Sequence, residues 1–342
     1  MSNDIIKLLD EKEAAARRNM RCGVIISSGA IGDCILMLPL AAAIKDSLAL
    51  GRMDFIGNSE HIEFYPNRTC IDAVRSIESI PMHRLFEDAQ QFDVDDPDML
   101  VNAFEPYEYI ISFMGDPDSN FHANLLYTVN CSHSGMVTML PFGPDENSGK
   151  HISLSYIDNF FSENTDIKPT EKFDINSTLI ASLDSDRENG AKMLESAGIE
   201  ADEKLIIICP GAGGVKKCWP MENFIKTAEM LSKTEVRTLF LLGPAETERF
   251  DETVIRAMDA VGKIFSNCSL TQVAQIIARA DLFLGNDSGI THMAGAMGKK
   301  TFAAFGATNP VFYRPVGTSV KTLDLAETPE NIGKMLLEDL HR

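Results

Sequence analysis

Three adjacent residues in the C-terminal half have the chemistry of a phosphate-binding turn. Asp287, Ser288 and Gly289 follow a short apolar stretch and precede a run of small residues around His292. That order is typical of a strand that turns into a helix, whose first N–H groups and positive end attract a phosphate. Asp and Ser are also common helix caps, so the turn taken alone leaves both interpretations open.

A glycine-rich segment after another apolar run carries two adjacent lysines. Residues 209–220 read CPGAGGVKKCWP, which matches neither the GxxxxGK phosphate loop nor the GxGxxG dinucleotide loop. A lysine beside flexible backbone amides still suits a diphosphate, because its ammonium neutralises charge on a departing phosphate. Gly211, Gly213 and Lys217 are therefore candidate phosphate-binding residues. The alternative for Lys217 is a solvated surface lysine, and Lys216 competes with it for the role.

Two acidic residues, Asp33 and Glu246, also lie in turns that follow apolar runs. Asp33 lies in Gly-Ala-Ile-Gly-Asp at the start of the first expected helix, where it is either a helix-start charge or a carboxylate that accepts a proton in a cleft. Glu246 follows an apolar run through Leu-Gly-Pro-Ala. It is either a reader of ribose or sugar hydroxyls or an exposed loop glutamate.

The elements that must position these residues alternate between strand and helix. A charged helix is expected over residues 1–20, and such alternation elsewhere predicts two parallel sheets, each covered by helices on both faces. Strands are expected at residues 22–27, 53–56, 73–77, 109–113, 136–140, 204–209, 236–242, 282–284 and 301–305. Helices are expected at residues 35–48, 185–197, 221–231, 270–280, 290–297 and 329–341.

A cluster of turn-forming residues divides the chain. Residues 141–150 concentrate Pro, Gly, Asn and Asp and interrupt the apolar periodicity, as a domain linker does. We therefore expect a first doubly wound domain over residues 1–150 and a second over residues 151–327, facing each other across a cleft. Residues 328–342 are expected to form a helix that packs back on the first domain.

Composition narrows the class of protein. The 342 residues are 44% hydrophobic and 24% charged with a net charge of −19, which indicates a globular protein and argues against nucleic acid as a partner. Residues 1–150 hold 11 Lys and Arg against 23 Asp and Glu, a net charge of −12. Seven scattered cysteines indicate reduced thiols, and neither a signal peptide nor a spanning segment is recognisable. A cytoplasmic location is expected.

One acidic stretch resembles a metal site only superficially. Asp93 and Asp95 form an Asp-x-Asp pair, but Pro97 and polar neighbours indicate a solvated loop without a rigid strand end behind it. We expect no metal ion and no cofactor.

The four segments, in their order, resemble glycosyltransferase family 9, the ADP-heptose:lipopolysaccharide heptosyltransferases, whose fold is GT-B. The matching pieces are GAIGDCILMLPL, PGAGGVKKCWP, LLGPAE and the stretch from SLTQVAQ to FGATNP, so the resemblance covers nearly the whole chain. It implies two Rossmann-like domains. It further implies Asp33 as the catalytic base, Lys217 on phosphate and sugar, Glu246 near the ribose, Cys268 lining the nucleobase, and Asp287, Ser288, Gly289 and His292 in the donor-binding element.

The resemblance implies an inverting transfer. A carboxylate takes the proton of an acceptor hydroxyl while that oxygen attacks the anomeric carbon opposite the departing nucleoside diphosphate. Fixed positive groups meet the charge of the leaving group, so no divalent ion is required. The implied donor is ADP-heptose as a substrate, and the implied acceptor is a glycan or glycolipid such as lipopolysaccharide core. Peripheral contact with the inner membrane face is compatible with that acceptor.

The acidity of the first half departs from this expectation, because lipopolysaccharide cores are anionic. A local basic patch with Arg17, Arg18 and Arg21 is one resolution, and a different acceptor is the other. A sugar-nucleotide epimerase of similar shape and a non-catalytic sugar-nucleotide sensor remain alternatives. An NAD-dependent oxidoreductase is disfavoured, since neither glycine-rich turn has the GxGxxG pattern with an acid about 20 residues onward.

Overall fold

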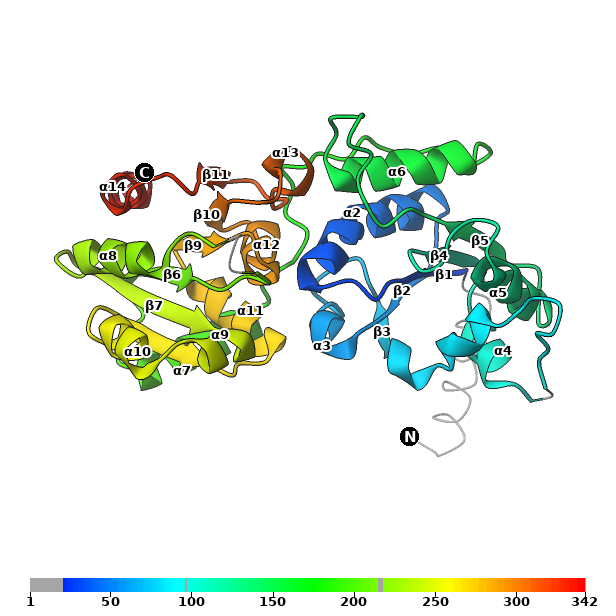
Figure 1. Ribbon diagram of the computed structural model, residues 1–342, viewed down its shortest axis with the longest axis horizontal. Coiled ribbons are helices and arrows are strands. Elements are labelled where there is room, and N and C mark those ends of the chain that lie inside the picture. The colour runs from blue at the N-terminus through cyan, green and yellow to red at the C-terminus, as the bar shows by residue number, and fades with distance from the viewer. Residues whose placement is uncertain (1–20, 96, 215–217, 342) are drawn as a thin grey trace, which may run out of the picture.

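The computed structural model describes residues 21–341 apart from residue 96 and residues 215–217. These residues form two lobes that lie side by side, each with a parallel sheet and surrounding helices (Figure 1). The helix expected over residues 1–20, with Arg17 and Arg18, lies outside the described range. The prediction of two doubly wound α/β domains is confirmed.

The first sheet has the strand order β3-β2-β1-β4-β5. Its apolar, β-branched runs are buried because helices cover both faces. The strands are β1 (Cys22–Ile26), β2 (Arg52–Gly57), β3 (Ala73–Ser76), β4 (Tyr109–Ser112) and β5 (Met136–Met139). The helices are α2 (Ile31–Ser47), α3 (Ser59–Ile62), α4 (Met99–Phe104), α5 (Asn120–Asn130) and α6 (Ile152–Glu163), with short 3-10 turns η1 (Ile77–Ser79) and η2 (Met82–Phe86).

The second sheet has the order β11-β10-β9-β6-β7-β8. Its strands are β6 (Lys204–Cys209), β7 (Val236–Leu242), β8 (Lys263–Ser266), β9 (Leu282–Asn286), β10 (Lys300–Phe305) and β11 (Val320–Asp324). Its helices are α7 (Asp184–Ser196), α8 (Met221–Leu231), α9 (Pro244–Arg249), α10 (Glu252–Asp259), α11 (Leu270–Arg279), α12 (Gly289–Ala296), α13 (Pro310–Tyr313) and α14 (Pro329–Leu340). Across the described residues, no helix combines the length and apolarity needed to cross a bilayer.

Both sheets reverse their winding direction at one point, and the candidate site residues follow the strands there. The reversal lies between β1 and β4 in the first sheet and between β6 and β9 in the second. In the second sheet Cys209 pairs with Gly285, so the glycine-rich loop and the turn at Asp287 start side by side. Ligands of open α/β sheets bind at such reversal points, at the carboxyl ends of the strands.

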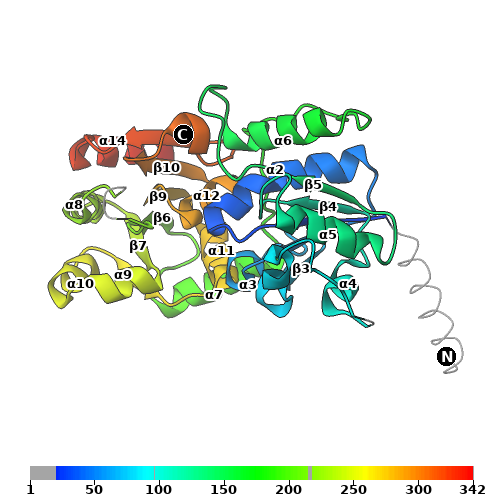
Figure 2. The same ribbon diagram turned by 45° about the vertical axis from the view of Figure 1, so that its right-hand side comes forward.

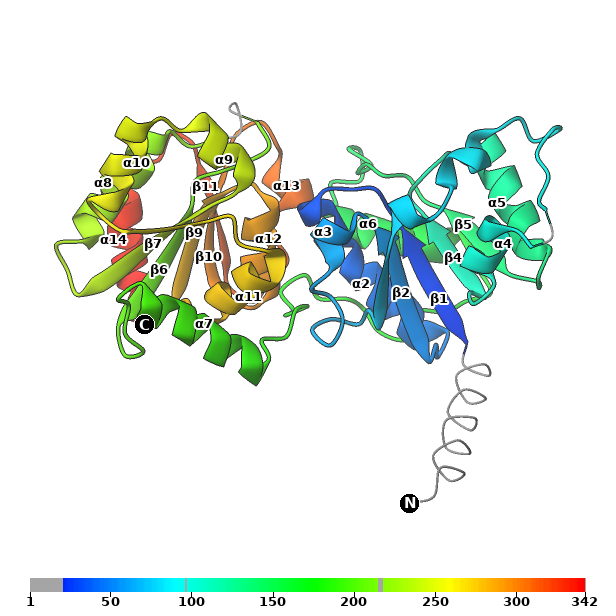
Figure 3. The same ribbon diagram turned by 90° about the horizontal axis from the view of Figure 1, so that it is seen from below.

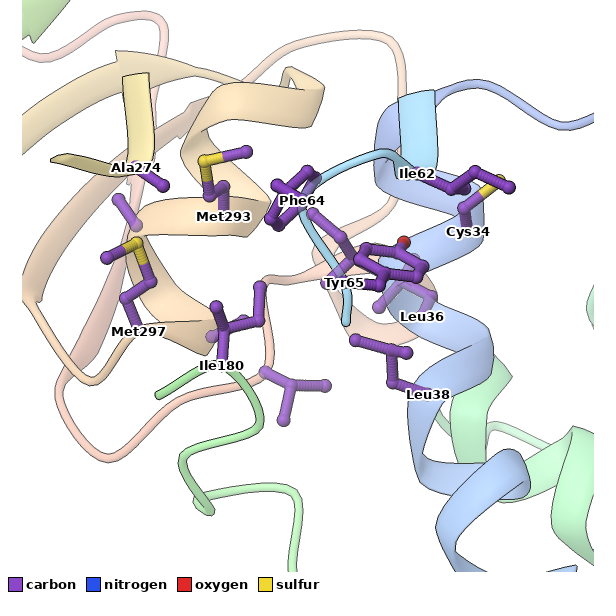
Figure 4. Packing of buried hydrophobic residues seen from close by; sticks show 14 of the residues in the cluster. Cys34, Leu36, Leu38, Ile62, Phe64, Tyr65, Ile180, Ala274, Met293 and Met297 are labelled. Carbon is purple, nitrogen blue, oxygen red and sulfur yellow. The ribbon is translucent and has the colours of Figure 1, made fainter. Parts of the chain in front are cut away.

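The two domains share one apolar interface. Helix α2 of the first domain packs against α12 of the second, as the turned views of Figures 2 and 3 also show. In Figure 4 the ring of Phe64 lies between Met293 of α12 and Tyr65 on the side of α2, and all three side chains are buried in the same cluster. A continuous hydrophobic cluster therefore joins the two domains.

Helix α14 does not pack where it was expected. It lies on α8 of the second domain, away from the first domain (Figure 1). Ile332 and Leu336 of α14 are buried in the same cluster as Trp219, and a Cβ added to Gly333 would lie 3.2 Å from Met230. The expectation that residues 328–342 return to the first domain is wrong, because the apolar side of α14 completes the core beside β11.

Helix α6 follows the predicted boundary at residues 150 and 151, yet it packs against α2 of the first domain. The Ser153 hydroxyl donates to the Leu36 carbonyl at 2.7 Å, and Tyr156 and Phe160 are buried. We therefore propose that the first domain includes α6 and that the crossing to the second domain follows it.

Candidate active site

The turn after β9 is a capped helix start. Ser288 is the N-cap of α12, and its hydroxyl accepts the Thr291 N–H at 3.4 Å. The Thr291 hydroxyl in turn donates to the Asn286 carbonyl at 2.6 Å. The helix-cap interpretation of Ser288 thus holds locally, and the positive end of α12 also faces the cleft.

Asp287 and His292 form the polar centre of this turn. Nε2 of His292 lies 3.4 Å from Oδ1 of Asp287, and the Thr308 hydroxyl donates to Oδ2 of the same carboxylate. His292 is buried, and its Nδ1 has no hydrogen-bond partner among the described protein groups. Thr308 follows β10, the neighbour of β9 in the sheet, so the carboxyl-end rule could have identified it from the sequence.

Gly289 is required by contact between the domains. A Cβ on Gly289 would lie 2.6 Å from the Cβ of Ile31, and one on Gly32 would lie 3.1 Å from Cδ2 of His292. The first turns of α2 and α12 therefore meet at two glycines. The structure gives Gly289 a packing role in addition to the phosphate-binding role expected of it.

Asn286 fixes both ends of the glycine-rich loop. Its Oδ1 accepts the Trp219 N–H at 2.7 Å, and its Nδ2 donates to the Pro210 carbonyl at 2.7 Å. Trp219 is buried, and its ring N–H donates to the Glu327 carbonyl at 3.0 Å. The loop therefore leaves and rejoins the sheet at defined points. Lys216 and Lys217 lie outside the described residues.

Glu246 lies against this loop. A Cβ on Gly211 would be 2.2 Å from Cδ of Glu246, so only glycine fits beside the carboxylate. Glu246 is buried and accepts the Gly243 N–H at 3.0 Å, which starts α9. Burial, and secondarily the charge of Glu246, raises the pKa of Cys209 to about 12. The alternative of an exposed loop glutamate is excluded by this burial.

A cavity of about 310 Å³ brings residues of both domains together. Its lining includes Ala30, Gly32 and Asp33 from the first domain and Asp287, Ser288, Gly289 and His292 from the second, with Gly213 at the loop. Tyr313 of α13 also lines it, and burial followed by the charge of Asp33 raises the pKa of Tyr313. Six of the candidate residues thus share one space, whereas Gly211 and Glu246 are not part of its described lining.

A second cavity, of about 520 Å³, opens on the other side of Asp33. It lies in the first domain and is lined by Gly29, Phe86, Phe113 and Phe142 together with Asp33. The Asp33 carboxylate accepts the Ala30 N–H at 3.1 Å, which holds it at the start of α2. Asp33 is therefore the carboxylate shared by both cavities. The phenylalanines carry no sequence motif and were not anticipated.

Two features lie away from these cavities. Cys268, expected near a nucleobase, follows β8 and is absent from the lining described for either cavity. A larger cavity of about 720 Å³ lies at the amino ends of β6 and β7, beside Lys204 and Arg237. Because parallel sheets bind ligands at the opposite, carboxyl ends, the smaller cavities at Asp33 are the better candidate site.

The acidic loop of the first domain is exposed, as expected. Asp93 and Asp95 are solvent-exposed, and Asp93 accepts a hydrogen bond from the Tyr127 hydroxyl. Within the described ranges, no three His, Cys, Asp or Glu side chains are grouped as metal ligands would be.

Two doubly wound domains with a cavity lined by residues of both are the arrangement of a GT-B-type protein. The profile of glycosyltransferase family 9 (heptosyltransferase) matches residues 162–335, just over half of the chain. The chain belongs to glycosyltransferase family 9. The resemblance recognised in the sequence is confirmed.

Sequence relatives match part of the chain. Lipooligosaccharide heptosyltransferase 2 of Haemophilus influenzae is 28% identical over 142 residues, which are 40% of this chain and 41% of that protein. Lipooligosaccharide heptosyltransferase 2 of Campylobacter jejuni is 34% identical over 110 residues, covering 31% and 34% of the two chains. The chain thus spans about two fifths of the length of the first of these relatives and about a third of the second.

Solved structures match over the whole fold. A family 9 glycosyltransferase from Veillonella parvula has a TM-score of 0.71 at 19% identity, with 94% of this chain and 97% of that chain covered. The Escherichia coli heptosyltransferase WaaC, solved with ADP, has a TM-score of 0.64 at 15% identity, with 94% and 100% covered. At these identities the likeness establishes the GT-B fold.

Proposed function

We propose that this protein is an inverting, metal-independent glycosyltransferase that moves a heptose from ADP-heptose to a glycan such as lipopolysaccharide core. The observation that carries the proposal is the position of Asp33 between two cavities, one at the helix start of α12 and one within the first domain. A base between donor and acceptor has to touch both spaces.

In this mechanism the Asp33 carboxylate accepts the proton of the acceptor hydroxyl as its oxygen attacks the anomeric carbon. The donor diphosphate lies against the first turn of α12, where Ser288, Gly289 and His292 line the cavity. Charge that develops on the leaving diphosphate is met by the N-terminus of α12 and by Lys217, so a divalent ion is not needed. The sugar is transferred in a single displacement at the anomeric carbon, and one displacement inverts the anomeric configuration.

The remaining donor residues surround the nucleoside. Gly211 and Glu246 adjoin each other, which supports Glu246 as the acid that binds ribose hydroxyls next to a closely approaching backbone. Gly213 continues the loop into the cavity. Cys268 is proposed near the nucleobase on the family resemblance alone. The WaaC structure solved with ADP supports ADP as the nucleoside diphosphate here.

Replacement of Asp33 tests the proposal. Asp33→Asn keeps an oxygen that accepts the Ala30 N–H but removes the base, so kcat should fall by at least about a hundredfold while ADP still binds. Asp184→Asn is the matched control, because Asp184 is also a first-turn aspartate and its side chain is 97% exposed. A variant at Asp33 with wild-type turnover would refute the assignment.

Three measurements separate the alternatives. A thermal-shift comparison of ADP, GDP and UDP identifies the nucleotide, because a ligand of the folded state raises the apparent stability. NMR of the product gives its anomeric configuration, and activity in EDTA tests metal independence. Conversion of the donor sugar without any acceptor would favour the epimerase, and binding without turnover across an acceptor panel would favour the sensor.

A further inference from the structure

The cavity of about 520 Å³ combines aromatic side chains with a single carboxylate. Asp33 is the only ionisable group among the described residues that line it, and Phe86, Phe113 and Phe142 belong to its walls. Its volume lies within the usual range for ligand pockets. The cavity opens at the carboxyl ends of β1 and β4, where the loops after these strands supply Gly29 and Gly115.

Two of the phenylalanines that line this space are exposed. Phe142 is 44% exposed, and a Cβ on Gly29 would lie 3.1 Å from its ring and 2.9 Å from the Cβ of Asp33. The Phe142 ring and the Asp33 side chain therefore flank the same glycine. Phe86 is 53% exposed, and its ring centroid lies 4.8 Å from that of Phe121, beneath Gly115.

The wall at Phe142 is held from behind by Tyr156 of α6. The Tyr156 hydroxyl donates to the Phe142 carbonyl at 2.8 Å, and its ring packs edge-on against Phe113 with centroids 4.7 Å apart. Tyr156 is buried. This hydrogen bond holds the backbone of Phe142, while its ring stays exposed beside the cavity.

Basic side chains of the first domain are already paired. Within the described part of residues 21–150, six form ion pairs with carboxylates, namely Arg21, Lys45, Arg52, Arg68, Arg84 and Lys150. The seventh, Arg75, donates to the Ala103 carbonyl at 2.7 Å. A basic patch that would attract an anionic acceptor is therefore not found among these residues.

Exposed acids are sequence neighbours of residues that line the cavity. Glu87 follows Phe86, and Asp116 and Asp118 come shortly after Gly115, whereas no Lys or Arg is among the described lining residues. Arg21, which the sequence suggested for a basic patch, precedes β1 and so lies at the opposite end of the sheet from the cavity. Like charges repel, so these acids disfavour a carboxylate or phosphate on the bound acceptor.

We infer that this cavity, which the proposed function places on the acceptor side of Asp33, takes an uncharged sugar ring in contact with both Phe86 and Phe142, with a hydroxyl directed at Asp33. A pyranose presents a face of C–H groups to an aromatic ring while its hydroxyls remain at the edge. That combination matches aromatic walls and a single carboxylate. The inference rests on the proposed transferase activity, and it assigns the acceptor residue that receives the sugar as neutral, in contrast to an anionic core sugar.

Matched acceptors test the charge. Methyl mannoside is compared with its 6-phosphate, and methyl glucoside with methyl glucuronide, with ADP-heptose as donor and transfer read by mass spectrometry. Binding of the same four glycosides to the protein with ADP is read by saturation-transfer NMR. The neutral member of each pair should bind and accept the sugar at least about tenfold better than its charged partner.

Matched variants test the walls. Phe86→Ala and Phe142→Ala should each raise the acceptor KM roughly two- to tenfold, the range for loss of one aromatic contact, with the ADP-induced thermal shift unchanged. Phe86→Tyr should keep the wild-type KM, whereas Phe86→Leu should not. Met99→Ala is the control, because Met99 is 64% exposed on α4 and does not line the cavity.

The acceptor and variant experiments distinguish failure of this inference from failure of the proposed donor. The inference would be overturned if the protein preferred the phosphate or the uronate, or transferred sugar only to a Ser/Thr peptide. It would also be overturned if neither neutral glycoside bound at 10 mM, roughly the weak limit for a lone sugar. Failure of ADP and ADP-heptose to bind would instead overturn the proposed donor. Glycoside binding to the protein without nucleotide would still report on the cavity in that case.

Discussion

A buried ion pair between the domains provides a quantitative test of the fold. Arg68 follows α3 in the first domain, and its side chain is 12% exposed, whereas Asp186 in the first turn of α7 is 0% exposed. Nε and Nη2 of Arg68 donate to the two carboxylate oxygens at 2.9 and 2.6 Å. Asp186 also accepts the Leu183 N–H at 3.1 Å, and the Arg68 carbonyl accepts the Ala181 N–H at 2.7 Å.

Arg68→Met should therefore be costly. The substitution leaves a buried carboxylate without its cation, which typically lowers the free energy of unfolding by about 3–5 kcal/mol. Exposed ion pairs contribute below about 1 kcal/mol to that free energy. The double variant Arg68→Met/Asp186→Leu should recover much of that loss, because no charge remains buried. Arg256→Met is the exposed control, since Arg256 and Glu252 form a helix-surface pair with side chains 80% and 86% exposed.

The loss of unfolding free energy in Arg68→Met should depend on pH. Burial alone would raise the pKa of Asp186, but hydrogen bonds from Arg68 and Leu183 lower it below the ordinary value of 3.8. A carboxyl with a depressed folded-state pKa stabilises the fold above its unfolded pKa and loses that contribution as pH falls through the folded value. The difference between wild type and Arg68→Met should thus be full at pH 7 and shrink below about pH 4. Urea unfolding at pH 7 and pH 3 measures it. A cost below about 1 kcal/mol at pH 7, or a double variant no more stable than the single one, would refute the reasoning.

Two further outcomes follow from the site. Gly289→Ala should lower the free energy of unfolding by about 1–3 kcal/mol and reduce transfer, because its Cβ would lie 2.6 Å from that of Ile31. Gly214→Ala, whose Cβ would have no atom of the described residues within 4 Å, should leave the thermal midpoint unchanged. Burial lowers the pKa of His151 from 6.5 to about 4, so stability should fall by up to about 3 kcal/mol as pH drops from 6.5 to 4. His151→Gln should flatten that part of the pH profile in calorimetry. An equally steep profile in the variant would show that another group is responsible.

Sequence patterns predicted most strands of both sheets and missed two exposed edge strands. β6 and β7 were predicted with the bounds observed, because each contains a buried apolar run. The edge strands β3 and β5 of the first sheet were also predicted, each one residue too long, whereas the edge strands β8 and β11 of the second sheet were missed because they contain exposed residues that interrupt the apolar pattern. Periodicity likewise showed which side of α14 is apolar but carried no information about the surface that covers it.

The site shows the same division between local and distant information. Asp33, Asp287 and Glu246 were found because each lies in the turn or first helical turn after a strand, where ligands of parallel sheets bind. The contact of Gly289 with Ile31 joins segments of different domains, and no local pattern encodes it. Phe86 and Phe142 belong to irregular segments that the fold alone brings beside Asp33.

The meeting of two helix starts at Gly32 and Gly289 links ligand binding to the arrangement of the domains. α2 begins at Ile31 and α12 at Gly289, and both glycines line one cavity. The start of α12 carries a partial positive charge of roughly half a unit, whereas the Asp33 carboxylate caps the start of α2 by accepting the Ala30 N–H. A ligand that contacts both helix starts favours the conformation in which the domains touch, and thermodynamic linkage makes the reverse hold equally. A substitution that separates the two helices therefore weakens the affinity for that ligand even though it removes no group that contacts it.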